Sequence, residues 1–236
     1  MTLEGTNSWV VGTDGAWVID PGPSLPEHLD ALERELEHRG GIAGIALTHG
    51  HADHSEAVPV LIDRLGEVPV VRSGPGAGSG AVHGPLEVFE LPGHSSDHLA
   101  FVSGTVAFTG DAVFAHSSVF VAPGRGSLSG YLSALEELAA LGPELIAPGH
   151  GPLIEDPVPR LRRQIDHRLE RERRLIEALD SGNATVAELL AVVWDDVPEQ
   201  LLPAATVTLA AHLDKLEEEG RLLGGVERPD IPEWVV

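Results

Sequence analysis

The sequence of 236 residues has no cysteine, and only one methionine and one tyrosine. The absence of cysteine excludes disulfides, thiolate metal sites and a cysteine nucleophile, so histidine and carboxylate side chains are the strong metal ligands that remain. No uninterrupted apolar run reaches about 18 residues, which argues against a membrane helix. The first residues, MTLEGTNSWVVGTDG, lack the basic and apolar regions of a signal peptide. We therefore expect a globular, cytoplasmic protein that does not bind membranes.

Basic residues are also scarce, because 15 Lys and Arg stand against 37 Asp and Glu, giving a formal charge of −22. Such a charge repels polyanions, so we do not expect DNA as a partner. Seven basic residues nevertheless lie between Arg160 and Arg174. They could follow a phosphate backbone, but the interleaved Asp166, Glu170 and Glu172 favour a salt-bridged helix face exposed to solvent.

The first two thirds of the chain alternates between strand and helix patterns. Apolar β-formers flank a turn at residues 12–15, and apolar residues at helix spacing follow from Pro26 to Arg39. The expected strands are 8–12, 16–20, 42–47, 86–91, 99–103, 105–109 and 144–147, and a second helix is expected at 127–141. The segment Ser73–Gly84 is nearly all Gly, Ala, Ser and Pro, which predicts a surface loop.

After Pro157 and Pro159 the pattern changes to successive helices. They are expected at 160–179, 185–194 and 203–219, the second starting with a capping box of Thr185 and Glu188. Residues 221–223 and 234–236, around Gly224-Gly225, fit a two-stranded wing. We therefore predict an α/β (α+β) domain over 1–156 and a small winged-helix domain over 157–236. The third helix is acidic, so we expect it to pack against the core or a second subunit, as in a homodimer.

Four potential metal ligands crowd into six residues of the motif THGHADH, directly after a predicted strand. In an extended segment positions i and i+2 project to the same side, so His49 and His51 can bind one ion. The turn that follows directs Asp53 and His54 to a neighbouring ion. His94, Asp111 and His150 each follow another predicted strand through a glycine-containing turn. This recurrence predicts that all seven residues form one dinuclear metal site.

The motifs THGHADH, PGHSSDH, FTGD and APGHGP resemble, in this order, those of the metallo-β-lactamase superfamily. The resemblance implies an αββα sandwich with the metals at one rim of two facing sheets. It implies His49, His51 and His94 on one ion, and Asp53, His54 and His150 on the other, with Asp111 bridging them. Asp20, in VIDPG, resembles the family's acid that orients metal ligands.

Two divalent ions roughly 3.5–4 Å apart would deprotonate a bridging water near neutral pH, which supplies the nucleophile. Zinc is the preferred ion for these ligands, and manganese or iron would also suit them. Asp53 is the candidate proton acceptor. His98 either shuttles a proton to the leaving group or is a core or surface histidine without a catalytic role.

The remaining histidines are expected to be structural or solvated: His28, His38, His83, His116, His167 and His212. His116 and Tyr131 flank a glycine-rich segment after Asp111 and are candidates for the substrate entrance.

Nearly the whole chain, including YLSALEELAALGPELIAPGHGP and HRLERERRLIEAL, resembles the beta-lactamase-like protein 2 group, which joins this hydrolase core to a winged helix. That group includes single-strand-selective endoribonucleases, so RNA phosphodiester cleavage is the leading hypothesis. The competing enzymatic hypothesis is hydrolysis of a small thioester, lactone or β-lactam. A third hypothesis is a non-catalytic binding module in which the metal serves only structure.

Overall fold

The computed structural model describes residues 5–222 and 224–231, which form two β-sheets and seven α-helices within that range. The elements up to the second sheet are β1 (Trp9–Val11), β2 (Ala16–Ile19), α1 (Pro26–His38), β3 (Ile42–Ala46), α2 (Ala52–Ser55), α3 (Val58–Leu65) and β4 (Val70–Val71). Then follow β5 (Val82–His83), β6 (Leu86–Glu90), β7 (Leu99–Ser103), β8 (Val106–Gly110), α4 (Leu128–Leu141), β9 (Leu145–Pro148), α5 (Pro157–Asp180), α6 (Val186–Val193), a 3-10 turn (Glu199–Leu201) and α7 (Leu202–Glu218).

The first sheet has the strand order β1-β2-β3-β4, and the second has the order β5-β6-β7-β8-β9. In the first sheet β1 pairs antiparallel with β2, whereas β2, β3 and β4 are parallel. In the second sheet the neighbours are antiparallel except for β8 and β9, which are parallel. Most of the predicted ligands follow the carboxyl ends of β3, β8 and β9, and Asp20 follows the carboxyl end of β2.

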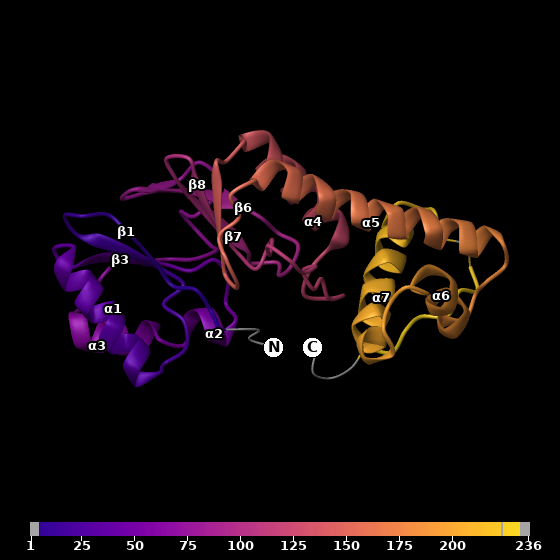
Figure 1. Ribbon diagram of the computed structural model, residues 1–236, viewed down its shortest axis with the longest axis horizontal. Helices are drawn as coiled ribbons and strands as arrows, with labels where there is room; N and C mark the ends of the chain where they lie inside the picture. The colour runs from indigo at the N-terminus through magenta and orange to yellow at the C-terminus, as the bar shows by residue number, and fades with distance from the viewer. Residues whose placement is uncertain (1–4, 223, 232–236) are drawn as a thin grey trace.

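The two sheets face each other, and helices cover their outer faces (Figure 1). Alternation along β2 shows how one strand serves both faces, since successive side chains of a strand point to opposite sides. Trp17 and Ile19 pack between the sheets, whereas Ala16 and Val18 pack against the helices α1 and α3. Helices α4 and α5 cover the second sheet through residues such as Leu135. The predicted αββα sandwich is confirmed.

Helix α5 connects this sandwich to the C-terminal helices (Figure 1). Its first half places Leu161 and Ile165 in the core beside α4, and its second half places Leu175 and Ala178 in a separate core with α6 and α7. The predicted domain boundary coincides with the start of α5. This helix packs both on the sandwich and on the C-terminal helices. Thr185 and Glu188 form the predicted capping box at the start of α6.

Helix α7 packs against the catalytic core, which agrees with the first of the two arrangements expected for it. Ala211 lies in the core beside α4, Val207 contacts Ala122, and the Ser129 hydroxyl donates to the Glu218 carboxylate at 3.0 Å. No strand follows α7 in the described residues, and much of the predicted wing, residues 223 and 234–236, lies outside them. None of the described helices is long and apolar enough to span a bilayer.

Two sequence-based expectations are wrong in part. The segment Ser73–Gly84 lies along β6 and contains the short strand β5, and its Ala77 is buried in the core between the sheets that also contains Trp17. The arginines of α5 do not form one solvent face, because Arg168 and Arg171 are buried. Only part of this helix, such as Arg173 with Glu170, is a salt-bridged surface.

Candidate metal centre

The predicted ligands lie where strands end at one rim of the sandwich. The loop after β3 provides the first two histidines, and α2 provides Asp53 and His54, with His51 as its N-cap residue. Asp111 directly follows β8, and His150 follows β9 after one glycine. Because β8 and β9 are adjacent and parallel, their last residues meet at the same edge. The structure brings all seven predicted ligands together.

The first group of ligands consists of His49, His51, His94 and Asp111, whose ligand atoms all lie within 4.8 Å of one another. Nδ1 of His51 lies 2.8 Å from Nε2 of His49 and 3.3 Å from Nε2 of His94. Burial, followed by the neighbouring imidazoles, lowers the pKa of both His49 and His51. These rings are therefore neutral at physiological pH, with lone pairs available to a metal ion.

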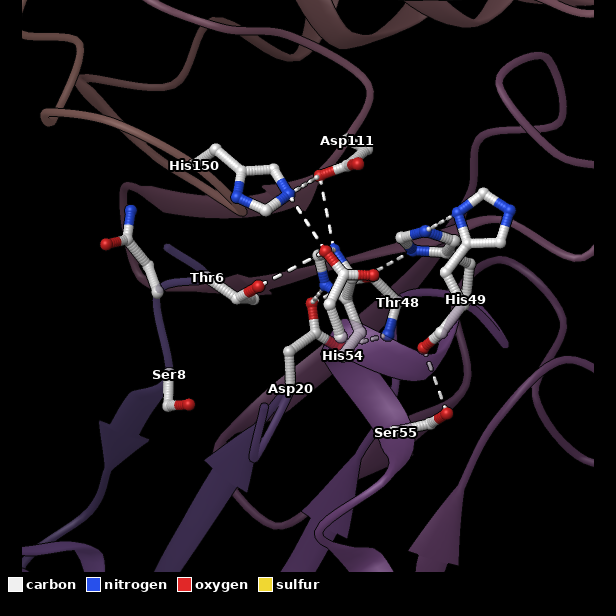
Figure 2. Close-up of polar contacts among 12 residues, drawn as sticks. Thr6, Ser8, Asp20, Thr48, His49, His54, Ser55, Asp111 and His150 are labelled. Atoms are coloured by element: carbon white, nitrogen blue, oxygen red, sulfur yellow. Dashed lines mark hydrogen bonds and ion pairs between the residues drawn. The ribbon is translucent and has the colours of Figure 1, made fainter. Parts of the chain in front are cut away.

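The second group consists of Asp53, His54 and His150, with ligand atoms again within 4.8 Å. The Asp111 carboxylate, a member of the first group, also lies against His54 and His150 of the second (Figure 2). Its Oδ1 is 3.4 Å from Nε2 of both His54 and His150, and its Oδ2 is 3.8 Å from Nε2 of His94. The two groups are therefore adjacent and share one carboxylate.

In the second group, a metal ion would compete with protons for the nitrogen atoms of two histidines. Burial alone would lower the pKa of His54, but the carboxylates of Asp111 and Asp20 outweigh it and raise the pKa to about 10. His150 behaves in the same way, since Asp111 and Asp53 raise its pKa to about 10 against the effect of burial. A metal ion would replace these protons among the carboxylates.

Orphaned polar atoms test whether these residues fit a metal. Nε2 of His54 and Oδ1 of Asp111 are buried and make no hydrogen bond, although buried polar groups nearly always have partners. Both atoms face the centre of the cluster (Figure 2). Imidazole nitrogens and carboxylate oxygens are the donors that zinc, manganese and iron accept. The residues present fit a pair of divalent ions.

Buried hydrogen bonds behind the ligands orient them. The Asp20 carboxylate accepts from the backbone N–H and the hydroxyl of Thr48, at 2.8 and 2.7 Å, and pairs with Nδ1 of His54 at 2.9 Å. This leaves Nε2 of His54 for the metal side. Asp20 has φ of +48°, which is strained for a residue other than glycine, so the surrounding contacts hold it there. Asp20 therefore has the orienting position that the family resemblance implies.

Backbone carbonyls fix two further imidazoles. Nδ1 of His94 lies 2.7 Å from the carbonyl oxygen of Phe120, and Nδ1 of His150 lies 2.8 Å from that of Gly5. An N–H donated to a carbonyl selects the tautomer with a lone pair on Nε2. In both residues Nε2 is the atom that faces the carboxylates of the cluster.

Gly149 shows why the ligand-bearing turns contain glycine. A Cβ at this position would lie 2.6 Å from Oδ1 of Asp111 and 2.8 Å from Cε1 of His54. Gly110 has φ of +46°, and its Cβ would meet the Thr48 hydroxyl at 2.3 Å. The absence of these side chains lets the strand ends approach closely enough to form one centre.

His98 lies behind the ligands. It is 1% exposed, its ring stacks on His49 with centroids 4.9 Å apart, and its Nε2 accepts the backbone N–H of Asp111 at 3.2 Å. Burial, followed by neighbouring His94, lowers its pKa to about 3, so the ring is neutral. Since its Nε2 lone pair is already engaged and the ring is buried, this geometry favours the expected alternative of a core histidine, which positions Asp111, over a proton shuttle.

Three residues that support the site were missed in the sequence. Asp97 accepts the N–H of Gly50 at 2.9 Å, which holds the loop between the first two histidines. Asn7 donates to the carbonyls of Pro148 and Gly151, and the Thr6 hydroxyl contacts Asp53 at 3.3 Å (Figure 2). The motif PGHSSDH contained the signal for Asp97. Nothing in the local pattern shows that Thr6 contacts Asp53, 47 residues away, or that Asn7 lies beside a turn over 140 residues away.

Tyr131, expected at the substrate entrance, is instead 1% exposed and donates its hydroxyl to the carbonyl of Ala112, because its helix faces the core. His116 is exposed on the segment after Asp111, as that expectation requires. His28 and His83 make hydrogen bonds to the carbonyls of Pro21 and Gly76, which agrees with structural roles.

The sequence matches the profile of the Metallo-beta-lactamase superfamily over residues 1–78 and 65–150. Residues 185–223 match the Beta-lactamase associated winged helix domain. The chain is 31% identical to the Beta-lactamase-like protein 2 homolog of Drosophila melanogaster, over 94% of this chain and 85% of that protein.

Two solved structures extend the comparison. A beta-lactamase domain protein from Burkholderia ambifaria has the same fold, with a TM-score of 0.73 and 19% identity over 94% of this chain and 85% of that one. The protein TTHA1623, solved in a di-iron-bound form, matches 64% of this chain and 89% of its own, with 30% identity and a TM-score of 0.56. With its αββα sandwich and the appended winged helix, the chain belongs to the metallo-β-lactamase superfamily, as a metal-dependent hydrolase.

Proposed function

We propose that this chain hydrolyses phosphodiester bonds of single-stranded RNA at a dinuclear metal centre. The observation that carries the hydrolytic part is the adjacency of two ligand groups that share the carboxylate of Asp111. Such an arrangement suits displacement at phosphorus, where the attacking and leaving oxygens both need stabilisation. The RNA part rests on the resemblance to the beta-lactamase-like protein 2 group.

When two divalent ions are bound, they lower the pKa of water toward neutrality and polarise the phosphoryl group. His49, His51 and His94 would hold one ion and Asp53, His54 and His150 the other, with Asp111 reaching both. We propose zinc as the resident ion. The di-iron form of TTHA1623 makes iron the first competitor, and elemental analysis of the purified chain decides between them.

Asp53 is the proposed proton acceptor. Its side chain is 25% exposed, whereas those of His54 and His150 are at most 2% exposed. The carboxylate therefore faces both the ligand cluster and the open side, where a proton can leave to solvent. The Thr6 hydroxyl, at 3.3 Å, holds one of its oxygens. His98 would keep Asp111 in place through its backbone amide.

A pocket bordered by Pro92 and Gly93, the two residues before His94, supports a small acyl compound as the second candidate substrate. It has a volume of about 470 Å³ and lies between the loop Pro92–Ser96, residues 123–128 and helix α7. This volume is that of a typical small-molecule site. Asp214, Glu217 and Glu218 line it, so it suits a neutral or cationic group better than a polyanion.

Parallel assays separate the two candidates. We expect the metal-loaded chain to cleave a single-stranded oligoribonucleotide, and a chelator to stop the reaction. His54→Ala and Asp111→Ala should abolish turnover while circular dichroism shows a retained fold. Hydrolysis of a hydroxyacyl-glutathione thioester without RNA cleavage would replace the first candidate by the second. Near-normal rates in either variant would contradict the assignment of the centre. The non-catalytic alternative is disfavoured, because the homologues in this superfamily are hydrolases.

A further inference from the structure

A second pocket, with a volume of about 230 Å³, lies on the side of the molecule formed by α5 and the segment after Asp111. Helix α5 lines it with Arg160, Arg163, Gln164 and His167, and the opposite wall is formed by residues 116–118. These helix positions follow the spacing i, i+3, i+4 and i+7, so their side chains share one face of the helix. We call this site the α5 pocket.

The α5 pocket is basic in a strongly acidic chain. Two arginines and two histidines line it, and none of the carboxylates in the described part of the chain does, although the whole chain contains 37 Asp and Glu. The larger pocket beside α7 differs, since Asp214, Glu217 and Glu218 line it together with Lys215 and Arg125. An anion that approaches this acidic protein is therefore attracted to the α5 pocket more than to the pocket beside α7.

The donors of the α5 pocket are partly fixed and partly free. Arg160 donates to the carbonyls of Phe114 and Ser117, at 2.7 and 2.6 Å, which holds the loop against the helix. Arg163 is exposed and has no hydrogen bond or ion pair within residues 5–222 and 224–231. Its guanidinium fork matches the geometry of a phosphate group. The hydroxyl of Ser118 accepts from Arg168 and keeps its own proton available.

A short segment connects the α5 pocket to the metal centre. It begins at the ligand Asp111 and reaches the pocket wall at His116. Between them, the ring of Phe114 packs on the ring of the ligand His150, with centroids 5.7 Å apart, and the Phe114 carbonyl accepts from Arg160. Phe114 therefore contacts both a ligand of the metal centre and a residue that lines the pocket.

We propose that the α5 pocket is a phosphate-binding subsite that holds a phosphate of the RNA strand near the one being cleaved, with Arg163 as its main contact. The identity of the strand rests on the proposed function. The affinity of the pocket for a phosphate group does not, so the two can fail separately.

Arg162 supplies a matched control for Arg163. It is exposed on the same helix and does not line the pocket. The variants Arg163→Gln and Arg162→Gln thus remove the same charge one residue apart. Binding of a fluorescent phosphorothioate oligoribonucleotide to the metal-loaded full chain is measured by anisotropy at several salt concentrations. Arg163→Gln should weaken binding on the order of tenfold and reduce the slope against log salt by about 0.7, the value for one phosphate of a single strand. Arg162→Gln should change affinity less than about twofold.

The oligonucleotide binding experiment can also contradict the subsite. Equal losses in both glutamine variants would overturn the subsite, since diffuse charge would then explain them. In turnover assays Arg163→Gln should raise KM and leave kcat close to the wild-type value, and Arg163→Lys should recover part of the loss.

Inorganic phosphate tests the pocket without RNA. Titration should shift the imidazole resonances of His116 and His167 in the wild-type full chain and not in Arg163→Gln. Shifts that require Arg163, together with no RNA turnover, would support the subsite and overturn the RNA substrate. RNA turnover whose KM is unaffected by Arg163→Gln would overturn the subsite and leave the proposed function intact. An oligonucleotide that binds no more tightly than inorganic phosphate would overturn the assignment to a strand.

Discussion

Two regions of the molecule bury several charged or titratable side chains, with different results. One is the metal centre. The other, which we call the helix cluster, lies between α5 and α7 and contains Arg168, Arg171, Glu172, His212 and Lys215, each at most 8% exposed. In the described residues, both groups able to hold an ion belong to the metal centre. Burial of polar groups alone therefore does not mark a functional site.

Both regions contain buried polar atoms without a hydrogen-bond partner, including both ring nitrogens of His212, so the difference lies in how the buried groups are arranged. In the helix cluster Lys215 pairs with Glu172 at 2.7 Å, and Arg168 and Arg171 donate to the carbonyls of Val119 and Val193. These bonds join the helices to the rest of the chain. In the metal centre, lone pairs from separate strand ends converge on common points. Convergence, rather than burial, distinguishes a site for a cation from a structural network.

The largest expected effect concerns the shared carboxylate. Asp111→Asn replaces a charge that faces both ligand groups with a neutral amide, so turnover should fall on the order of 10³-fold or more, which corresponds to about 4 kcal/mol of barrier. Steady-state kinetics on the hydrolysed substrate measures the loss. A fall of less than about tenfold, with both ions retained, would show that Asp111 does not link the two groups.

Lys215→Met should instead affect stability. It removes the nearer of two cationic partners of the buried Glu172 carboxylate, the other being Arg221 at 3.4 Å, so the free energy of unfolding should fall by about 3 kcal/mol, while metal content is unchanged. Urea unfolding of the full chain measures it. Arg173→Met is the matched control, because this exposed arginine pairs with Glu170 and Glu177 in solvent and should leave the free energy of unfolding close to the wild-type value. Equal effects would remove the distinction between buried and surface pairs.

Asp20→Asn should weaken metal binding by about 10- to 100-fold, because it removes the charged partner that orients His54. Competition with a chromophoric chelator gives the affinity. Asp63→Asn, an exposed position, serves as the control and should bind metal like the wild type. An unchanged affinity in Asp20→Asn would mean that Thr48 and the loop backbone position His54 without it.

A further expected effect is a pH dependence in the helix cluster. Burial, followed by nearby cations, lowers the pKa of His212 from 6.5 to about 3. The unfolded chain therefore binds a proton that the folded chain excludes, and stability that is present above pH 6.5 is lost as the pH falls toward 3. The groups that face the ring are His167, Arg168, Arg171, Glu172, Trp194 and Lys215.

Thermal unfolding measured between pH 6.5 and 3 tests this loss of stability. His212→Leu should flatten the dependence relative to His38→Leu, which alters an exposed histidine. Equal acid sensitivity in both variants would show that protonation of His212 does not contribute. The metal-free form of both variants should be used, so that loss of metal does not add to the slope.

The same contrast explains how much the sequence could predict. Strand ends were predictable, because alternating apolar residues followed by glycine turns predict where backbone direction changes, and the ligands stand at those points. The strands β4 and β5 were not predicted, because two residues carry no period. The single-turn helix α2 was missed because it is so short, and α3 was missed as well. The buried arginines of α5 were missed, since a helical repeat does not show that carbonyls of distant loops lie within reach of Arg168.

The count of bound ions tests the central claim most directly. Elemental analysis of the wild-type chain, His94→Ala and His54→Ala, each equilibrated with metal and then dialysed, should give two ions for the wild type. Each variant should keep about one, because these histidines belong to different ligand groups. Fewer than one ion in the wild-type chain, or an unchanged content in both variants, would contradict the dinuclear centre.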